Sequence, residues 1–161
     1  MLSPNDLTAA LARNVNIVKM QSEGITHAES LMQLPFQGNC LNWVVGHLAL
    51  SRDDMLEVLG ESPMMAAKGA RYDRGSELLT SDEEGVLPLE DLLAHLDKTQ
   101  ERLSTILGQM NDAEMSRELT LSNNRKMTLG QRLFFFYFHE VYHVGQTELL
   151  RQLTGRNDKL I

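Results

Sequence analysis

Two of the five histidines in this sequence, His139 and His143, lie four residues apart in a strongly apolar segment. On an α-helix this spacing puts both imidazoles on one face, which is how a helix offers two nitrogen ligands to one metal ion. Two histidines on a buried face need polar partners, and a shared cation would satisfy both. Hydrogen-bonded core histidines are the alternative, and the spacing alone leaves the choice between these interpretations open.

A third ligand has to come from another part of the chain, and His47 is the candidate. On a helix it shares an inward face with Cys40, Trp43, Val44, Ser51, Asp54 and Val58. Gly46, next to it, has no side chain and would let a neighbouring helix approach closely. We interpret His27 as a structural residue near the C-terminal end of the first helix, where a cation is favoured, and His95 as a surface or boundary residue.

Three polar residues lie one or two helical turns from these histidines. Ser51 and Asp54 follow His47 on the same side of the helix, and Gln146 lies one turn after His143. We expect at least one of the three to reach the site and orient a ligand or substrate. Ordinary polar residues at one end of a bundle are the alternative.

The segment from His139 to His143 also fits the H-E-x-x-H motif of zinc proteases. We consider this match misleading, because only 18 residues follow His143 and no acidic ligand stands well downstream. Gln146 and Leu149 occupy the positions where the longer protease motif has glycine and histidine. Glu140 is then a solvated carboxylate, or one that supports a ligand.

Four stretches show helical periodicity and would position these residues. The first runs from a capping box at residues 3–6 to about residues 28–31, and the second covers residues 39–59. The third runs from residue 87 or 88 to 110, and the fourth begins with a T-x-x-Q box and covers residues 128–154. The pattern predicts an all-α fold, a four-helix bundle with up-and-down or crossover connections, in a single domain over residues 1–161.

Two long connectors separate the predicted helices. Residues 61–87 are rich in polar residues, and we expect a short helix over about residues 81–85. Long ordered connectors in small domains often cover functional sites. Residues 111–127 form the second connector, with a short extended piece at 118–121, but no alternating run is long enough to predict a sheet.

The six consecutive apolar residues 133–138 sweep more than a full turn, so one bundle interior cannot cover them all. With Phe135 and Phe136 placed inward beside the histidines, an outer stripe remains, formed by Phe134, Tyr137, Phe138, Val141, Val144 and Gly145. A large exposed apolar patch marks an interface, so we expect a homodimer through the fourth helix. Cover by the first connector is the alternative, offering Met64, Met65 or Tyr72.

Composition excludes several classes of function. The 15 basic and 22 acidic residues give a net charge of −7, which disfavours nucleic-acid phosphates and a polybasic membrane contact. A single cysteine, Cys40, excludes an internal disulfide and a cysteine-rich zinc finger. The sequence shows no signal-peptide pattern and no run near the roughly 18 apolar residues of a membrane span, so we expect a cytoplasmic protein.

Two sets of residues together resemble the DinB/YfiT-like superfamily. The first set is Asn42, Trp43, Gly46, His47, Ser51 and Arg52, and the second is His139, His143, Gly145, Gln146, Leu150 and Arg151. The resemblance implies a four-helix bundle with three histidines around a divalent metal. It carries the ligand positions over to His47, His139 and His143, and it favours zinc or nickel.

The resemblance implies two kinds of chemistry. Relatives include enzymes called metal-dependent hydrolases, transferases that use low-molecular-weight thiols such as bacillithiol, and a mycothiol-dependent isomerase. A metal with an open position could lower the pKa of a water or of a thiol. We therefore expect a metal-dependent hydrolase or a thiol-dependent S-transferase acting on a small molecule, with a thiol cosubstrate in the second case. The alternatives are a stress-response bundle that binds metal or ligand without turnover, and an interaction module whose histidines are core residues.

Overall fold

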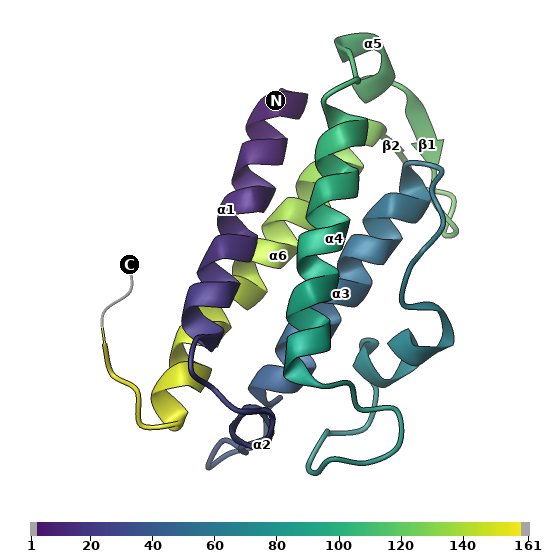
Figure 1. The fold of residues 1–161 in the computed structure, drawn as a ribbon. Coiled ribbons are helices and arrows are strands. Elements are labelled where there is room, and N and C mark those ends of the chain that lie inside the picture. Colours follow the sequence, from purple (N-terminus) through teal and green to yellow (C-terminus); the bar gives the residue numbers. More distant parts are fainter. Residues whose placement is uncertain (1–2, 159–161) are drawn as a thin grey trace.

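Four long helices form a bundle in the computed structural model (Figure 1). The structure describes residues 3–158, apart from the side chains of residues 66–68. They are α1 (Pro4–Ser22), α3 (Leu41–Val58), α4 (Leu89–Leu107) and α6 (Leu129–Leu153). α1 and α3 each pack against both α4 and α6, so the four helices surround one core. The expected all-α four-helix bundle is confirmed.

The capping residues explain where the helices begin. The Ser3 hydroxyl accepts a hydrogen bond from the backbone N–H of Asp6, and the backbone N–H of Ser3 donates to the Asp6 carboxylate, which completes the predicted capping box. Thr128 and Gln131 form the same box at the start of α6. α1 is shorter than expected and ends at Ser22, because Gly24 adopts a positive φ and a second capping box opens α2 (His27–Ser30) immediately afterwards.

The connections give the bundle its topology. His27 Nδ1 accepts a hydrogen bond from the backbone N–H of Leu89 at 3.3 Å and lies 3.5 Å from Asn42 Nδ2, so α3 and α4 begin beside each other. These two helices therefore run parallel, and the connector between them returns along the side of the bundle (Figure 1). His27 consequently stands at the N-terminus of α2 rather than near the C-terminus of the first helix, which corrects the predicted position.

Both connectors differ in detail from the prediction. The expected short helix over residues 81–85 is absent, and residues 66–72 form the 3₁₀ helix η1 (Ala66–Tyr72), which packs on α3. The second connector contains α5 (Asp112–Met115) and a two-stranded antiparallel hairpin, β1 (Glu118–Thr120) with β2 (Lys126–Thr128). Only the first of these strands was expected, because three-residue strands are too short to show alternation.

Two apolar clusters fill the bundle, and a polar layer lies between them. One cluster gathers Val15, Val18, Val44, Leu92 and Leu96, and the other Leu7, Leu11, Leu56, Leu103 and Phe136. Between them the buried Arg52 donates from Nε and Nη2 to the two carboxylate oxygens of Glu140, each at 2.8 Å. Glu140 is thus buried in an ion pair with Arg52, so the expectation of a solvated carboxylate was wrong.

The inward face of α6 is turned by about one residue, roughly 100°, from the predicted face. The buried residues of α6 are Leu129, Gly130, Leu133, Phe136, Glu140, Val144, Thr147, Leu150 and Arg151. Phe135 and Tyr142, predicted to face inward, are 50% and 63% exposed, whereas Val144, predicted for the outer stripe, is buried. Glu140 explains the difference, because its bonds to Arg52 require that side of the helix to face the interior.

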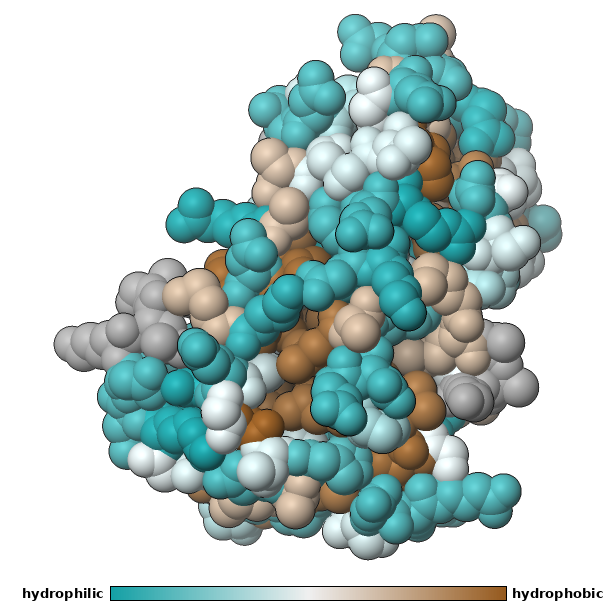
Figure 2. Space-filling model, viewed as in Figure 1, coloured by the Kyte–Doolittle hydropathy of each residue, from teal (hydrophilic) through white to brown (hydrophobic). Residues whose placement is uncertain are grey.

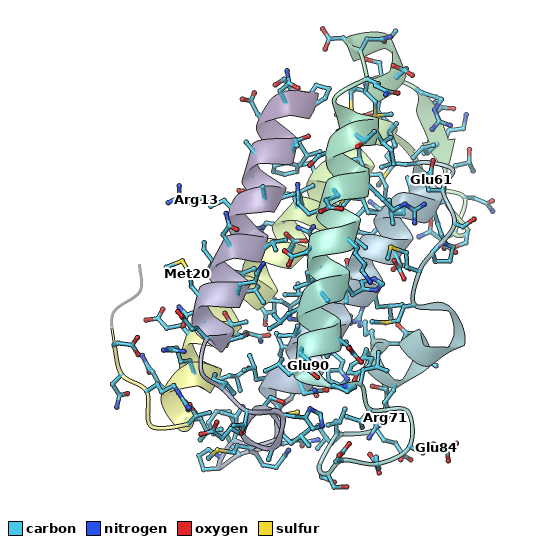
Figure 3. The ribbon with its side chains drawn as sticks, in the orientation of Figure 1. Arg13, Met20, Glu61, Arg71, Glu84 and Glu90 are labelled. Atoms are coloured by element: carbon cyan, nitrogen blue, oxygen red, sulfur yellow. The ribbon has the colours of Figure 1, made fainter. Side chains whose placement is uncertain are left out.

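The surface seen in Figure 2 is mostly hydrophilic, with hydrophobic residues visible in strips between polar ones. In the same orientation, side chains such as Arg13, Glu61 and Glu90 point outward from the bundle (Figure 3). On α6, which lies behind α1 and α4 in this view, Phe134, Phe138 and Val141 are 50%, 62% and 41% exposed. No helix within residues 3–158 is long and apolar enough to cross a membrane.

Candidate metal centre

His47 points from the middle of α3 toward α6, and two contacts hold its ring. Its Nδ1 donates to the backbone carbonyl of Tyr72, at 2.7 Å, in the last residue of η1. Its ring stacks on Trp43, one helical turn earlier, with a centroid distance of 4.7 Å and an interplanar angle of 14°. Because Nδ1 is occupied by an acceptor, the nitrogen that remains available is Nε2.

Gly46 is the reason that the Tyr72 carbonyl can reach His47. A Cβ atom at this position would lie 2.1 Å from the Tyr72 ring, closer than any real contact. The neighbour that Gly46 admits is therefore a buried tyrosine at the end of the connector's 3₁₀ helix η1, which packs on α3. The Tyr72 hydroxyl donates to Asn42 Oδ1 at 3.1 Å and accepts from Leu87 N at 2.7 Å, which locks this residue in place.

His139 and His143 face His47 from adjacent turns of α6. His143 Nδ1 donates to Gln146 Oε1 at 2.8 Å, and His139 Nδ1 lies 3.4 Å from Ser51 Oγ. Their Nδ1 atoms are thus turned to oxygen partners, as in His47. Orienting contacts of this kind are typical of histidines that bind metal through Nε2.

The three imidazoles converge. Nε2 of His47 lies 3.2 Å from Nε2 of His139, and one ring nitrogen of each of the three histidines lies within 4.8 Å of the others. Two nitrogens that are each about 2.0–2.1 Å from one tetrahedral ion are roughly 3.3 Å apart. The donor set and its spacing therefore suit one small divalent ion, and the grouping of these residues is as expected from the sequence.

The electrostatic environment keeps the pair on α6 neutral. Burial lowers the pKa of His139 to about 4, and His143, His47 and the Arg74 guanidinium add to this effect. Burial also lowers the pKa of His143, against the opposing hydrogen bond to Gln146. A neutral imidazole is the form that binds a metal, so these two rings need not lose a proton near neutral pH.

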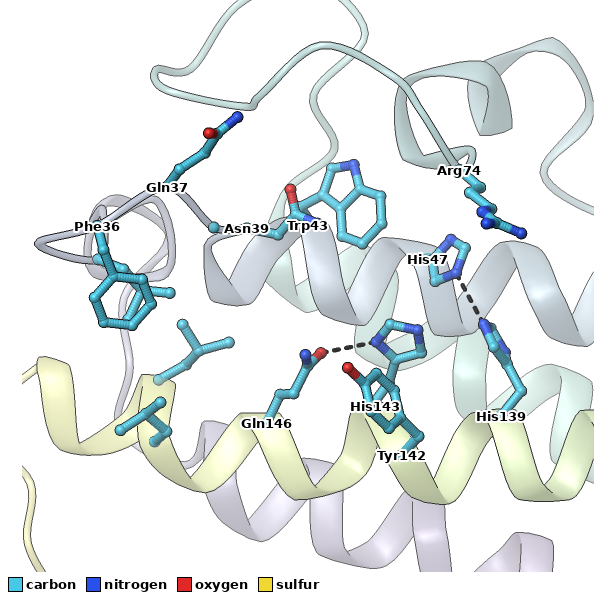
Figure 4. A pocket seen from close by; sticks show the side chains of 14 residues that line it. Phe36, Gln37, Asn39, Trp43, His47, Arg74, His139, Tyr142, His143 and Gln146 are labelled. Carbon is cyan, nitrogen blue, oxygen red and sulfur yellow. Dashed lines mark hydrogen bonds between the residues drawn. The ribbon is translucent and has the colours of Figure 1, made fainter.

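A pocket of about 630 Å³ opens beside the histidines, between α3, α6 and the loop before α3. Figure 4 shows Arg74 next to His47 and His139 at one end, and Phe36 and Gln37 toward the other. Apolar and aromatic side chains make up much of the wall, namely Leu34, Phe36, Trp43, Tyr142, Leu149 and Leu150. No aspartate or glutamate is among the described lining residues.

The structure separates the predicted supporting residues. Ser51 and Gln146 contact His139 and His143, respectively. Asp54 is exposed and does not line the pocket. Desolvation of its carboxylate by neighbouring atoms, and the nearby Glu57 carboxylate, raise its pKa. It carries no role at this site.

The other histidines lie outside the cluster. His27 faces Asp82 at 3.4 Å, and His95 Nε2 lies 3.1 Å from Asp53 Oδ1. Sequence reasoning missed the contributions of Tyr72 and of Arg74, because both come from the connector, where no periodicity predicts orientation.

Comparison with known proteins agrees with this arrangement. The family model described as the DinB superfamily matches residues 23–147, which is most of the chain. The chain belongs to the DinB superfamily. Among solved structures, this DinB-superfamily protein is similar over 97% of its length to a conserved protein from Enterococcus faecalis, which is covered to 99%, with a TM-score of 0.73 and 20% identity.

A second similar structure is YfiT from Bacillus subtilis, described as a probable metal-dependent hydrolase with an unusual four-helix bundle topology. It is 18% identical, with a TM-score of 0.69, and the match covers 98% of this chain and 92% of YfiT. At this level of identity the two structures establish a shared fold. Comparison with curated proteins gives no match.

Proposed function

We propose that this protein is a metal-dependent enzyme that transforms a small molecule in the pocket beside His47, His139 and His143. The observation that carries the proposal is the convergence of three imidazoles whose Nδ1 atoms all face oxygen partners. Membership of the DinB superfamily and the description of YfiT support it. The three histidines would hold one divalent ion. Neutral imidazoles suit zinc, nickel, copper or iron, and the family resemblance favours zinc or nickel among them.

The chain's own residues prepare this site. Three oxygen partners orient the three rings, namely the Tyr72 carbonyl, Ser51 and the Gln146 side chain. The ring nitrogens are therefore already directed toward one point before an ion binds. Trp43 covers one side of His47 and keeps water from that face. A bound ion would supply Lewis acidity that lowers the pKa of a water or of a thiol placed against it.

Two reaction classes fit, and one feature of the pocket favours S-transfer over hydrolysis. Metal-assisted hydrolysis gains from a general base that takes a proton from water, yet no carboxylate is among the described lining residues. A thiol loses its proton far more readily than water does. The thiol releases its proton to solvent, the thiolate sulfur forms a bond to an electrophilic carbon, and the leaving group departs from that carbon with its electron pair.

The thiol has to come from a low-molecular-weight cosubstrate. Cys40, the only cysteine, is buried at the start of α3, and burial raises the pKa of its thiol. A buried thiol of raised pKa is a poor nucleophile. Cys40 also does not line the pocket.

Metal content tests the site. We expect about one zinc or nickel ion per chain in the purified protein, and loss of that ion from His139→Ala. His27→Gln is the matched control, because His27 lies outside the cluster, and it should retain the ion. A wild-type protein that neither contains nor binds a divalent ion contradicts the proposal.

Activity on a panel of electrophiles then separates the chemistries. Metal-dependent turnover that requires added thiol supports S-transfer, whereas thiol-independent turnover assigns hydrolysis. A loaded protein that binds small molecules without converting any of them supports the non-catalytic alternative.

A further inference from the structure

Arg74 differs from the other residues of the pocket in its charge. The described lining contains one arginine, no lysine and no carboxylate, in a chain whose net charge is −7. An arginine side chain remains charged at any physiological pH. The pocket therefore presents a permanent positive charge, while the rest of the molecule is acidic.

The Arg74 guanidinium is not used by the fold. It forms no hydrogen bond or ion pair with the residues that the structure describes, and Arg74 is exposed. The adjacent carboxylate of Asp73 accepts a hydrogen bond from the backbone N–H of Arg74, at 2.6 Å, rather than from its side chain. The five donors of the guanidinium are thus available to a ligand.

The turn that carries Arg74 is held on both sides by residues of the metal centre. Before it, the Tyr72 carbonyl accepts from His47 Nδ1. After it, Ser76 Oγ accepts from the indole Nε1 of Trp43, at 3.0 Å. Ser76 N also donates to Asp73 O at 3.1 Å, which closes the turn. Arg74 is therefore positioned by the same contacts that orient His47.

The charge and the apolar wall lie at different places along the pocket. Figure 4 places Arg74 beside His47 and His139, and places Phe36 toward the opposite end, with Trp43 between them. A ligand that uses both features has its anionic group next to the three imidazoles and an apolar body that extends toward Phe36 and Leu149. One arginine matches one carboxylate in a bidentate contact.

We propose that Arg74 is the substrate-binding residue of this pocket, and that the protein acts on a small carboxylate with an apolar body. This inference rests on the proposed function, because it assigns the substrate class of that same site. The carboxylate can belong to the electrophile or to the thiol cosubstrate. Both sources give the same contact with Arg74, and the experiment distinguishes them.

Binding can be measured without turnover, because Trp43 is the only tryptophan and it lines the pocket. Its fluorescence is titrated with phenylacetate and with the neutral phenylacetamide, in the full-length protein at constant ionic strength. We expect the wild type to prefer the carboxylate. Arg74→Gln should weaken phenylacetate binding about tenfold, since a charge-assisted contact is lost, and should leave phenylacetamide within about twofold. Arg74→Lys should retain part of the preference.

Arg13→Gln is the matched control, because it removes the same charge from an exposed arginine that points away from the bundle (Figure 3). It should bind both probes as the wild type does. The inference is overturned by any one of three results. In the first, the wild type binds no phenylacetate or shows no preference for it. In the second, Arg74→Gln binds both probes as the wild type does. In the third, Arg13→Gln weakens phenylacetate binding as much as Arg74→Gln does.

Repeating the titration after metal depletion keeps this inference distinguishable from the proposed function. If the protein binds no metal but Arg74→Gln still loses the carboxylate preference, only the proposed function fails. If metal binds normally and Arg74→Gln has no effect, only this inference fails. In the metal-loaded enzyme, the KM values of Arg74→Gln are compared with those of the wild type. If the variant has a higher KM for thioglycolate but not for mercaptoethanol, the carboxylate belongs to the thiol. If its KM is higher only for an electrophile that carries a carboxylate, the carboxylate belongs to that substrate.

Discussion

Replacing Gly46 by alanine should damage both the fold and the metal centre, although the same change usually stabilises a helix. In an exposed helix, glycine to alanine gains about 1 kcal/mol. Here the new Cβ would lie 2.1, 2.4 and 2.6 Å from three atoms of the Tyr72 ring. The ring is completely buried, so it cannot simply turn aside into solvent.

The expected cost follows from these contacts. Overpacking of this kind costs about 1–3 kcal/mol. Displacing the ring also weakens the two hydrogen bonds of the Tyr72 hydroxyl, each worth about 1 kcal/mol. After subtracting the gain in helix propensity, we expect the free energy of unfolding to fall by about 2–4 kcal/mol. The Tyr72 carbonyl would move as well, and losing its bond to His47 should reduce metal affinity about 10- to 100-fold.

Two measurements check this prediction: urea denaturation for stability, and competition with a chelating dye for metal affinity. Gly145→Ala is the matched control, because Gly145 also lies within a helix but a Cβ there meets no atom within 4 Å. It should be neutral or gain up to about 1 kcal/mol, with unchanged metal affinity. A Gly46→Ala protein as stable as Gly145→Ala would refute the reasoning.

A double-mutant cycle isolates the contact itself. In a Tyr72→Ala background the ring is gone, so Gly46→Ala should no longer destabilise and should recover its helix-propensity gain. We therefore expect a coupling energy of about 2 kcal/mol or more between the two positions. Additive effects would show that the glycine is required for some other reason.

Three further predictions follow from buried charges and exposed aromatic residues. Glu140→Gln should lower the free energy of unfolding by about 3 kcal/mol, because it leaves a buried arginine unpaired. It should still bind one metal ion, because the histidine rings keep their own oxygen partners, and the exposed Glu148→Gln serves as control. Burial raises the pKa of Asp53, but hydrogen bonds from His95 and two backbone N–H groups outweigh it and lower the pKa overall. The stabilisation that ionised Asp53 gives to the fold is therefore complete above about pH 5 and is lost as the pH falls below about 4. In Asp53→Asn the free energy of unfolding should depend less on pH in that range. We propose that the exposed stripe on α6 forms a homodimer, so light scattering should give a dimer for the wild type and a monomer for Phe134→Glu with Val141→Glu, and a monomeric wild type contradicts the proposal.

Much of the architecture could be predicted from local signals in the sequence. The capping boxes at Ser3 and Thr128 and the helical periodicity placed the long helices within a few residues, except at the end of α1. There the overlooked signal was a second box, Thr26 with Glu29, directly after Gly24. The three histidines were also predictable, because their helical spacing restricts where the imidazoles can point.

The contributions of the first connector could not be predicted in the same way. Nothing in the sequence around Tyr72 shows that its backbone carbonyl accepts from His47, because every residue carries a carbonyl. Arg74 has the composition of an ordinary surface residue, and only the turn between Tyr72 and Ser76 brings it to the pocket. A glycine within an apolar helix indicates that another group approaches closely. That this group is the Tyr72 ring could not be predicted from the sequence.

The resemblance to the zinc-protease motif has a structural explanation in this protein. Arg52 and Glu140 join α3 to α6 through two buried hydrogen bonds, and these bonds set the rotation of each helix relative to the other. With Glu140 facing the core, the histidines one residue before it and three residues after it fall on the flank of α6 that faces α3. The glutamate of the H-E-x-x-H pattern thus places the histidines at the edge of the bundle, where a pocket can open beside them. If Glu140 were instead a catalytic base, Glu140→Gln would abolish activity while leaving stability intact, which is the opposite of the result expected from its burial.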